Sequence, residues 1–380
     1  MIKPKIRFKG FEGGWKAEEL AHVCSVNRGV RVTRNDLHNN GIYPVYQNTD
    51  YPMVYYTKFN VESNNPFVIV GGSAGLIGFC HTNFWAADDC VFFGDNPIIN
   101  KSFLYNNLIF HKTEIKRNVR GASVPRLDRE TLRKLPVSIP SLPEQQEIAS
   151  YFTSLDSQIS ASTSRLASLK QMKSASLQAM FPQEGETVPK IRFKGFEGEW
   201  KKVKADSIFK TFNEKNRPDL PVLSATQDRG MVTRESIGYN IFHDTSNEAT
   251  YKHILPGQFV IHLRSFQGGF AHSEIEGIAS PAYTIMDFKN KDLYHDYYWR
   301  YVFMSKEFIK RLELITYGIR DGRSISYDEF KEMSFLVPSK EEQIKIASYL
   351  KNLDRQISLQ SQRLEKLKQI KSACLDKMFV

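Results

Sequence analysis

Two stretches of the sequence decide the fold: PEQQEIASYFTSLDSQIS at residues 143–160 and KEEQIKIASYLKNLDRQIS at residues 340–358. When Leu155 is aligned with Leu353, the similarity continues to the Met-Phe pair that begins at Met180 and at Met378. Solenoid repeats are about 20–50 residues long, so the much longer period of this sequence indicates two copies of a whole domain with an appended segment.

A shorter repeat precedes each of these stretches. PKIRFKGFEG at residues 4–13 returns unchanged at residues 189–198, so that Pro4 corresponds to Pro189. The order is therefore short repeat, variable block and helix-like block, and then the same three again. The two short repeats are closer together than the two helix-like blocks, so the variable block is longer in the second half.

The short repeat alternates Lys and Arg with Ile6 and Phe8, which predicts a strand with one buried face. We expect Phe8, Phe11 and Trp15 to anchor it at the beginning of each domain, and its basic face to meet phosphates or a partner subunit. A surface that binds a different target in each copy should differ between the copies, and this repeat does not. We therefore expect specificity to lie in the blocks that follow it.

Between Glu144 and Phe181 there is no Gly or Pro, and apolar residues recur at spacings of four and three. That spacing is typical of a coiled-coil seam. A helix of about 39 residues is roughly 58 Å long. We expect the two helices to bury their seams against each other, antiparallel; the alternative is two unrelated surface helices. The predicted seam residues are Ile148, Phe152, Leu155, Ile159, Leu166, Leu169, Ile346, Leu350, Leu353, Ile357, Leu364 and Leu367.

Polar residues interrupt both seams at equivalent positions, Ser162 with Gln360 and Lys173 with Lys371. Each variable block carries strand-like runs such as PFVIVGG and AYTIMDF, with helical stretches near residues 101–117 and 295–314. The predicted class is α/β (α+β): two mixed α/β domains in tandem, joined by two long helices in a pseudo-twofold antiparallel coiled coil. The expected divisions are a first domain at 1–142, its helix at 143–181, a linker at 182–188, a second domain at 189–339 and its helix at 340–380.

The composition narrows the class of protein. The 380 residues are 41% hydrophobic and 25% charged, and 52 Lys and Arg against 42 acids give a net charge of +10. This excess suits a polyanion such as nucleic acid or an anionic membrane surface, although ordinary solubility charge would also explain it. The four cysteines form no C-x-x-C pair, and no apolar stretch approaches the roughly 18 residues of a membrane span. We expect a cytoplasmic protein with no membrane partner.

Motifs for enzyme chemistry are weak. GGSAGLIG at residues 71–78 would need a helix directly after it to bind a dinucleotide, but FCHTNFWAADDCVFF is strand-like and favours a tight hairpin or a backbone that lies close to a ligand. NNPF at residues 64–67 lacks the second proline of the amino-methyltransferase motif. Glu114 and Lys116 could be half of a nuclease site, a spacing frequent by chance. We predict no catalytic residues and no metal site.

Basic and polar residues of the variable blocks are the predicted DNA contacts, because Arg binds phosphates or a guanine edge and Gln suits adenine. For any one of them a solvated surface charge is the alternative. The candidates are Arg28, Arg31, Arg34, Ser73, Lys112, Lys116, Arg117, Arg120, Arg126, Arg217, Arg229, Arg234, Arg264, Gln267, Arg320 and Arg323.

The chain resembles the specificity (S) subunit of type I restriction-modification systems. The tandem KIRFKGFEG-x-W segments and the helices beginning PEQQEIASYF and KEEQIKIASYL carry the resemblance, together with IPSLPEQQEI at residues 139–148. The second copy departs mildly from the last pattern, with VPSKEEQIKI. The resemblance covers nearly the whole chain.

The resemblance implies two target recognition domains, each binding one half of a split double-stranded DNA sequence. The helices would set the spacer and dock two methyltransferase (M) subunits, and restriction/translocase (R) subunits would join for cleavage. S-adenosylmethionine, ATP and Mg would be used by those partners, with no cofactor in this chain. The alternatives are a fused methyltransferase-nuclease with drifted motifs and a coiled-coil adaptor without DNA specificity. The bulk of the variable blocks argues against the adaptor.

Overall fold

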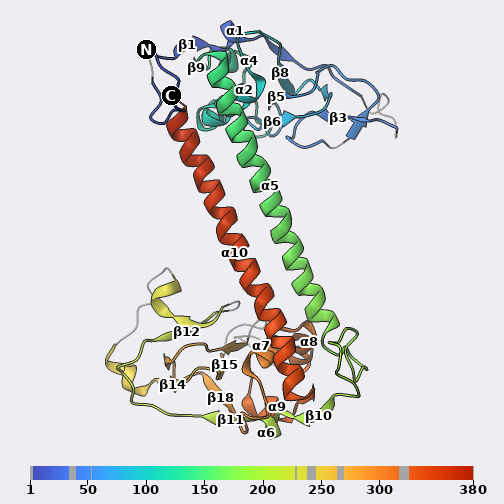
Figure 1. Ribbon diagram of the computed structural model, residues 1–380, viewed down its shortest axis with the longest axis vertical. Helices are drawn as coiled ribbons and strands as arrows, with labels where there is room; N and C mark the ends of the chain where they lie inside the picture. The colour runs from blue at the N-terminus through green and yellow to red at the C-terminus, as the bar shows by residue number, and fades with distance from the viewer. Residues whose placement is uncertain are drawn as a thin grey trace. The chain divides into compact units, whose positions relative to one another are not determined.

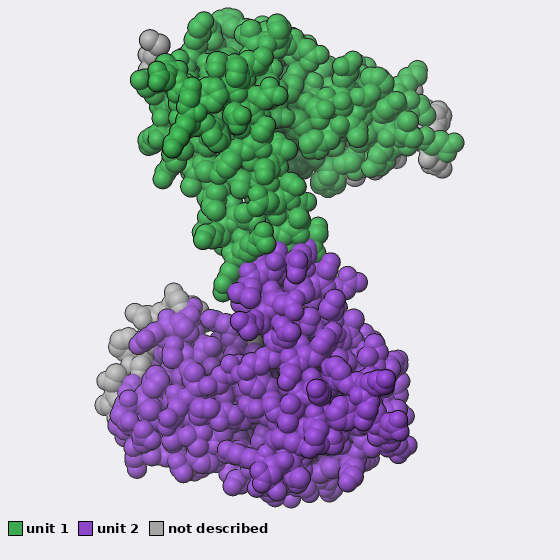
Figure 2. Space-filling model, in the orientation of Figure 1, with its two compact units in different colours: residues 1–164, 361–380 green, residues 165–360 purple. Residues whose placement is uncertain are grey.

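The structure is a computed structural model that describes residues 3–33, 40–52, 54–226, 229–237, 245–262, 269–315 and 325–379. The chain forms two compact units, coloured separately in Figure 2. Unit 1 consists of residues 1–164 and 361–380, and unit 2 of residues 165–360. Each unit therefore holds one variable block together with part of both long helices. The boundaries between the units lie within the two long helices, whereas the divisions expected from the sequence lie at the ends of those helices.

Unit 1 is built around an antiparallel sheet in which the apolar runs of the first variable block pair with one another (Figure 1). Its order is β2-β8-β5-β6, and all five residues of β5 are buried. A second sheet has the order β4-β3-β7, and β1 pairs with β9. The strands are β1 (Lys16–Glu19), β2 (Val26–Arg28), β3 (Tyr43–Tyr46), β4 (Val54–Tyr56), β5 (Asn65–Ile69), β6 (Ile77–Cys80), β7 (Trp85–Ala86), β8 (Cys90–Phe93) and β9 (Pro136–Ile139).

Apart from the long helix α5, the helices of unit 1 are short. Helical content predicted near residues 101–117 divides into two helices at His111. The first begins where the Asn100 side chain accepts a hydrogen bond from the Phe103 amide at 3.0 Å, an N-cap. The helices are α1 (Leu20–Val23), α2 (Lys101–Phe110), α3 (Lys112–Arg117), α4 (Arg129–Arg133) and α5 (Leu142–Ala179).

Unit 2 repeats this plan. Its main sheet has the order β11-β18-β15-β16, the counterpart of β2-β8-β5-β6, and β10 pairs with β19 as β1 does with β9. The strands are β10 (Lys201–Lys204), β11 (Phe209–Phe212), β12 (Leu223–Thr226), β13 (Gly230–Thr233), β14 (Lys252–Ile254), β15 (Phe259–Ile261), β16 (Phe270–His272), β17 (Gly277–Ala279), β18 (Thr284–Phe288) and β19 (Ser334–Val337). The helices are α6 (Ala205–Ile208), η2 (Arg234–Ile237), η3 (Thr245–Thr250), α7 (Asp296–Met304), α8 (Lys306–Ile315), α9 (Tyr327–Glu332) and α10 (Lys340–Met378).

The shared strand order confirms the predicted fold class, two mixed α/β domains of one fold in tandem, with two long helices. The segment predicted to link the halves, residues 182–188, is itself hydrogen-bonded. The Gln183 side chain donates to the carbonyl groups of Gln178 and Phe181, which caps the end of α5. The Trp200 amide donates to the Thr187 carbonyl at 3.1 Å.

The long helices run antiparallel where they meet inside each unit. In unit 1, Tyr151 of α5 lies 3.4 Å from the sulfur of Cys374 in α10, and the next contact along α5 is to an earlier residue of α10, Asp156 to Lys371 at 2.5 Å. Eight seam residues are buried, and Ile159, Leu166, Ile357 and Leu367 are half-buried. The buried ones are Ile148, Phe152, Leu155, Leu169, Ile346, Leu350, Leu353 and Leu364.

Unit 2 contains the same helix contacts at the equivalent positions of the second copy. Ser176 of α5 lies 3.3 Å from the hydroxyl of Tyr349, in the places of Cys374 and Tyr151. Lys173 and Asp354 approach to 2.6 Å, as Lys371 and Asp156 do in unit 1. Two lysines that interrupt the apolar seam are thus each neutralised by an aspartate of the other helix.

The prediction that the short repeat forms a strand is wrong. Residues 4–13 have no strand structure, and Ile6, expected on a buried face, is 45% exposed. Instead Trp15 is buried, and the ring of Phe8 packs edge-on against Tyr151 at 5.8 Å. The Ile6 amide donates to the Lys377 carbonyl at 3.0 Å, and so attaches the segment to the end of α10.

Arg7 of the short repeat is half-buried and pairs with a buried acid. Its Nε and Nη2 donate to the two carboxylate oxygens of Glu144, both at 2.7 Å, and its Nη1 donates to the Gly13 carbonyl at 2.6 Å. The side chain of Glu144 is only 1% exposed and accepts a third bond from Nε1 of Trp15 at 3.3 Å. Hydrogen bonding to Glu144 raises the pKa of the Arg7 guanidinium. Of the basic face that was expected to meet phosphates or a partner subunit, Arg7 is thus engaged in an ion pair within the protein.

The second copy has the same pair at equivalent positions. Arg192 donates to both carboxylate oxygens of Glu342 at 2.7 and 2.8 Å, and the Glu342 side chain is also 1% exposed. The next residue of each helix, Gln145 or Gln343, is fully buried and donates to the carbonyl of the proline that precedes the helix, Pro140 or Pro338. The repeated Glu-Gln of the two helix starts is thus part of the core.

We expect Glu144→Gln to destabilise unit 1 by about 3 kcal/mol, because it leaves the partly buried Arg7 without its charged partner. Glu342→Gln should act equally on unit 2. Thermal and urea unfolding would measure both. Glu147→Gln, an exposed acid on the same helix, is the matched control and should change stability by less than about 0.5 kcal/mol. Equal effects of Glu144→Gln and the control would contradict a structural role for the pair.

Candidate nucleic-acid interface

In unit 1 two loops with candidate residues lie against each other. The turn between β5 and β6 carries GGSAG, and residues 118–128 lie between α3 and α4. The Gly72 amide donates to the Pro125 carbonyl at 3.1 Å, and the Leu127 amide donates to the Val70 carbonyl at 2.9 Å. These bonds fix the backbone on both sides of Arg126, which pairs with Gly71 as in an antiparallel ladder.

Three arginines gather at this junction. The backbone groups of Arg120 and Arg126 exchange two hydrogen bonds, at 2.7 and 2.8 Å, and close a turn in which Gly121 has φ +95°. The Arg120 guanidinium donates to the Arg117 carbonyl at 3.0 Å. Only a residue without Cβ adopts such a φ readily, so the glycine at this turn permits the close pairing of the two arginines.

Further candidates border the same junction. The Ser73 amide donates to the Asn48 carbonyl at 3.3 Å, and a Cβ placed on Gly75 would lie 3.4 Å from Cγ of Lys116. Nε of Arg28 donates to the Asp88 carbonyl at 2.8 Å, and Nη1 of Arg126 lies 3.5 Å from Oδ1 of the neighbouring Asp89.

The candidates of the first variable block therefore fall into three groups. Arg28, Ser73, Lys116, Arg117, Arg120 and Arg126 are brought together by these contacts. Lys112 begins α3 and Arg31 follows β2, and both are exposed. Arg34 lies outside the described residues. The gathered residues carry exposed positive charge next to a rigid, glycine-containing backbone, which suits a polyanion.

In unit 2 the described candidates have different surroundings. Arg217 donates to both oxygens of Asp219 at 3.0 Å and lies 3.7 Å from Glu276. Hydrogen bonding to Asp219 raises the pKa of Arg217 and lowers that of Asp219. Arg229 is exposed at the turn between β12 and β13, and Arg234 is half-buried after β13. Arg264, Gln267, Arg320 and Arg323 lie outside the described residues.

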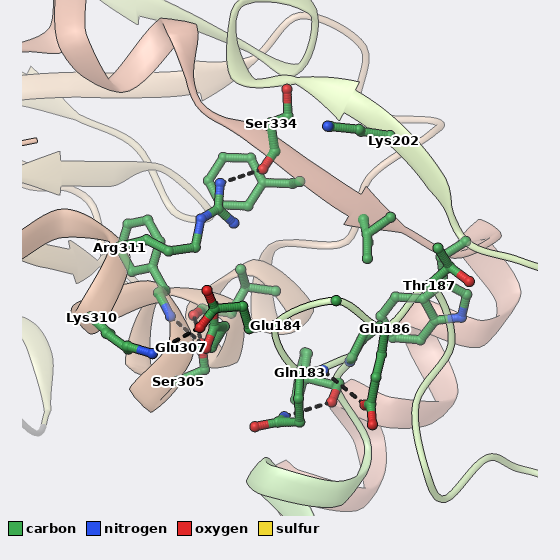
Figure 3. A pocket seen from close by; sticks show the side chains of 18 of the residues that line it. Gln183, Glu184, Glu186, Thr187, Lys202, Ser305, Glu307, Lys310, Arg311 and Ser334 are labelled. Carbon is green, nitrogen blue, oxygen red and sulfur yellow. Dashed lines mark hydrogen bonds and ion pairs between the residues drawn. The ribbon is translucent and has the colours of Figure 1, made fainter. Parts of the chain in front are cut away.

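Unit 2 also contains a cavity of about 560 Å³ beside the end of α5 (Figure 3). Several of its charged groups pair with one another or with backbone: Lys310 pairs with Glu184 at 2.8 Å, and Arg311 donates to the Ser334 carbonyl at 2.5 Å. Glu186 accepts a bond from the Gln183 amide at 3.0 Å. No His, Cys or Asp is among the described residues that line it, so these walls offer neither an imidazole nor a thiol for catalysis.

Two of the weak enzyme motifs, NNPF and GGSAGLIG, belong to the β5–β6 pair, whereas Glu114 and Lys116 lie in α3. GGSAGLIG connects β5 to β6, which pair antiparallel, so the predicted hairpin is confirmed and no helix follows the glycines. Within the ranges that the structure describes, no group of three or more His, Cys, Asp or Glu side chains is placed to hold a metal ion. None of the helices in those ranges combines the length and apolarity required to span a bilayer.

The sequence alone did not identify the acids that pair with arginines, neither Glu144 and Glu342 in the core nor Asp89 at the candidate interface. Glu144 and Glu342 were visible as part of a repeated pattern, but a Glu in the first turn of a helix is usually solvent-exposed. Asp89 follows Asp88 in a strand-like run, and nothing local links it to Arg126, which lies in a later loop. Repetition of Glu in both copies was the one available signal, and it applied only to the helix starts.

The geometry defines a class of protein: two copies of an α/β domain, each closed by one part of two long antiparallel helices. Comparison with known families gives the class a name. The profile of the type I restriction modification DNA specificity domain matches residues 12–171 and 197–369, once in each half of the chain. The matches cover most of the chain, which therefore belongs to this family.

Individual relatives agree with the family. The type I restriction enzyme EcoDI specificity subunit of Escherichia coli is 23% identical over 210 residues, 54% of this chain and 46% of that protein. The match thus spans less than half of that relative. The type I restriction enzyme MjaVIII specificity subunit of Methanocaldococcus jannaschii is 21% identical over 364 residues, 88% of this chain and 85% of the relative.

A solved structure has the same fold. The crystal structure of the S subunit of a type I restriction-modification system from M. genitalium matches with a TM-score of 0.70 and 16% sequence identity. The match covers 100% of this chain and 99% of that chain. At this level of identity the likeness shows a shared fold.

Proposed function

We propose that this chain is the non-catalytic DNA-specificity subunit of a type I restriction-modification complex. The observation that carries the proposal is the duplication of one buried framework around two variable blocks of different sequence. The same ion pair, helix contacts and strand order occur in both units. The variable blocks that carry the candidate residues differ between the two halves in sequence and in length. Two different readers on one framework suit a target with two different halves.

Each recognition region would bind one half of a bipartite double-stranded DNA target. In unit 1 the exposed Arg and Lys side chains of α3 and of the adjoining loop supply positive charge for phosphates and donors for base edges. Two half-site binders on one chain act at high effective concentration, so modest affinity in each half gives tight binding of the whole target.

The long helices would set the unread spacer and dock two M subunits, with R subunits joining for cleavage. In support, α5 spans 38 residues without interruption, which corresponds to about 57 Å. That length is about one and a half turns of DNA at roughly 3.4 Å per base pair. S-adenosylmethionine, ATP and Mg would be used by the partner subunits, as expected for a chain whose relatives are named specificity subunits.

Exchanging residues 17–140 for the corresponding block of another specificity subunit should change one half of the methylated sequence only. The reason is that this block supplies the loops and α3 of unit 1 and leaves the Arg7–Glu144 pair in place. Sequencing that detects methylated adenines, in cells that express the chain with its M subunits, measures the outcome. A change in both halves would contradict modular reading.

Inserting seven residues at matched points of α5 and α10 should lengthen the spacer by about three base pairs and leave both half-sites unchanged. Seven residues add about 10.5 Å and return the seam to the same face within about 20°. Five residues, the control insertion, would turn the seam away from the partner helix and should abolish assembly. The same methylation mapping detects both results, and an unchanged spacer after the seven-residue insertion would exclude the helices as its determinant.

The isolated chain should not bind S-adenosylmethionine. Calorimetric titration of the purified chain should give no saturable heat, whereas addition of the M subunits should restore binding. Saturable, tight binding by the isolated chain would favour the alternative of a fused methyltransferase.

A further inference from the structure

Arg126 has an exposed side chain on a backbone that is hydrogen-bonded on both sides. Its guanidinium side chain is 63% accessible, whereas its backbone lies in the middle of a small antiparallel arrangement. On one side it exchanges two hydrogen bonds with Arg120, and on the other it pairs with Gly71. The next residue, Leu127, is buried, which fixes the chain direction at this point. An arginine that served only as solubility charge would need no such support.

The half-buried Asp89 lies beside the side chain of Arg126. Its Oδ1 lies 3.5 Å from Nη1 of Arg126, and its side chain is 23% exposed. Gly71 lies directly beneath it: a Cβ at this position would come within 2.3 Å of the same carboxylate oxygen. Glycine at position 71 therefore leaves the space that the Asp89 carboxylate occupies beside the arginine.

This arrangement suits a base edge better than a phosphate. A guanidinium binds O6 and N7 of guanine through two parallel donors, which requires a fixed plane. The Asp89 carboxylate, 3.5 Å from Nη1, attracts the guanidinium on one side and so reduces the entropy lost on binding. A phosphate contact tolerates a mobile side chain and is weakened by a neighbouring negative charge. Lys112, Lys116 and Arg117, exposed on α3, suit phosphates.

The two copies of the chain differ at this position while their frame agrees. In the alignment that places Leu155 on Leu353, Asp128 corresponds to Ser326, and each of these two accepts a hydrogen bond at the start of the following helix. Leu127 corresponds to Ile325, and both are buried. Arg126 corresponds to Ser324 in the sequence. A residue that reads sequence should differ between two half-sites, whereas a residue that supports the fold should keep its character.

We propose that Arg126 reads a guanine in the first half of the target, and that Asp89 is the positioning residue that holds its guanidinium. This inference rests on the proposed function, and it identifies one base contact within that function.

The experiment uses the full chain in complex with its M subunits. The complex first selects its target from randomised duplexes. Binding is then measured for every base substitution in the first half-site, at several salt concentrations, with the Arg126→Lys, Asp89→Asn and Arg117→Gln variants. Arg126→Lys keeps the charge and removes the fork. It should lose discrimination of about 5- to 150-fold at a single G·C pair, with an unchanged salt slope.

Asp89→Asn should reduce the discrimination at the same base pair by a smaller factor. A merely structural role of Asp89 would not predict this loss at one base pair. Arg117→Gln, the control on α3, should weaken binding to all sequences alike and lower the salt slope by about 0.9. Thermal unfolding checks each variant. Should Arg126→Lys fail to fold, Arg126→Gln is measured in its place at the same base pairs.

The outcomes separate this inference from the proposed function. A wild-type complex that selects no bipartite sequence would overturn the proposed function itself. A wild-type complex that does select one, with Arg126→Lys weakening all sequences equally or changing no base pair, would overturn only the role of Arg126. A first half-site without a G·C pair would overturn it as well.

Discussion

The buried ion pair between the short repeat and the first turn of each long helix is the constraint on which the rest of the structure depends. Glu144 and Glu342 are almost completely excluded from solvent, so each carboxylate requires a charged partner that satisfies both of its oxygens. Arg7 and Arg192 provide that partner from segments that lie far earlier in the chain. The pair joins the beginning of each domain to the beginning of its helix.

This requirement accounts for the arginine and the tryptophan that occur at equivalent positions in both copies. The short repeat has a basic composition, but its arginine pairs with the buried Glu144. The tryptophan that follows the repeat lies in the aromatic core. Trp15 packs edge-on against Phe103 and Phe379, and Trp200 packs in the same manner against Tyr298 and Phe181. Residues that complete a shared core cannot diverge freely, whereas exposed residues on the loops can. Identity between the copies therefore marks the framework, and difference marks the candidate reading surfaces.

Much of the fold could be predicted from the sequence, because helix periodicity and β-branched runs are local signals. The seam spacing from Ile148 to Leu169 and the apolar run PFVIV gave elements where the structure has them. The short repeat misled because alternating Lys and apolar residues resemble a strand, while the partners that determine its conformation, Glu144 and Lys377, are distant in sequence. The contact of Asp89 with Arg126 likewise depends on two loops meeting, which no local pattern encodes.

The polar interruptions of the seam explain why the helices adopt one register. Lys371 meets Asp156 in unit 1, and Lys173 meets Asp354 in unit 2. A shift of one heptad, or a parallel pairing, would place each lysine in the apolar seam without its aspartate, at a cost in desolvation that the apolar residues alone would not impose. Leucine and isoleucine at the remaining positions stabilise many alignments about equally. The two Lys–Asp pairs therefore select the antiparallel alignment, and the equal spacing of the pairs from the two helix starts keeps the contacts of the two units equivalent.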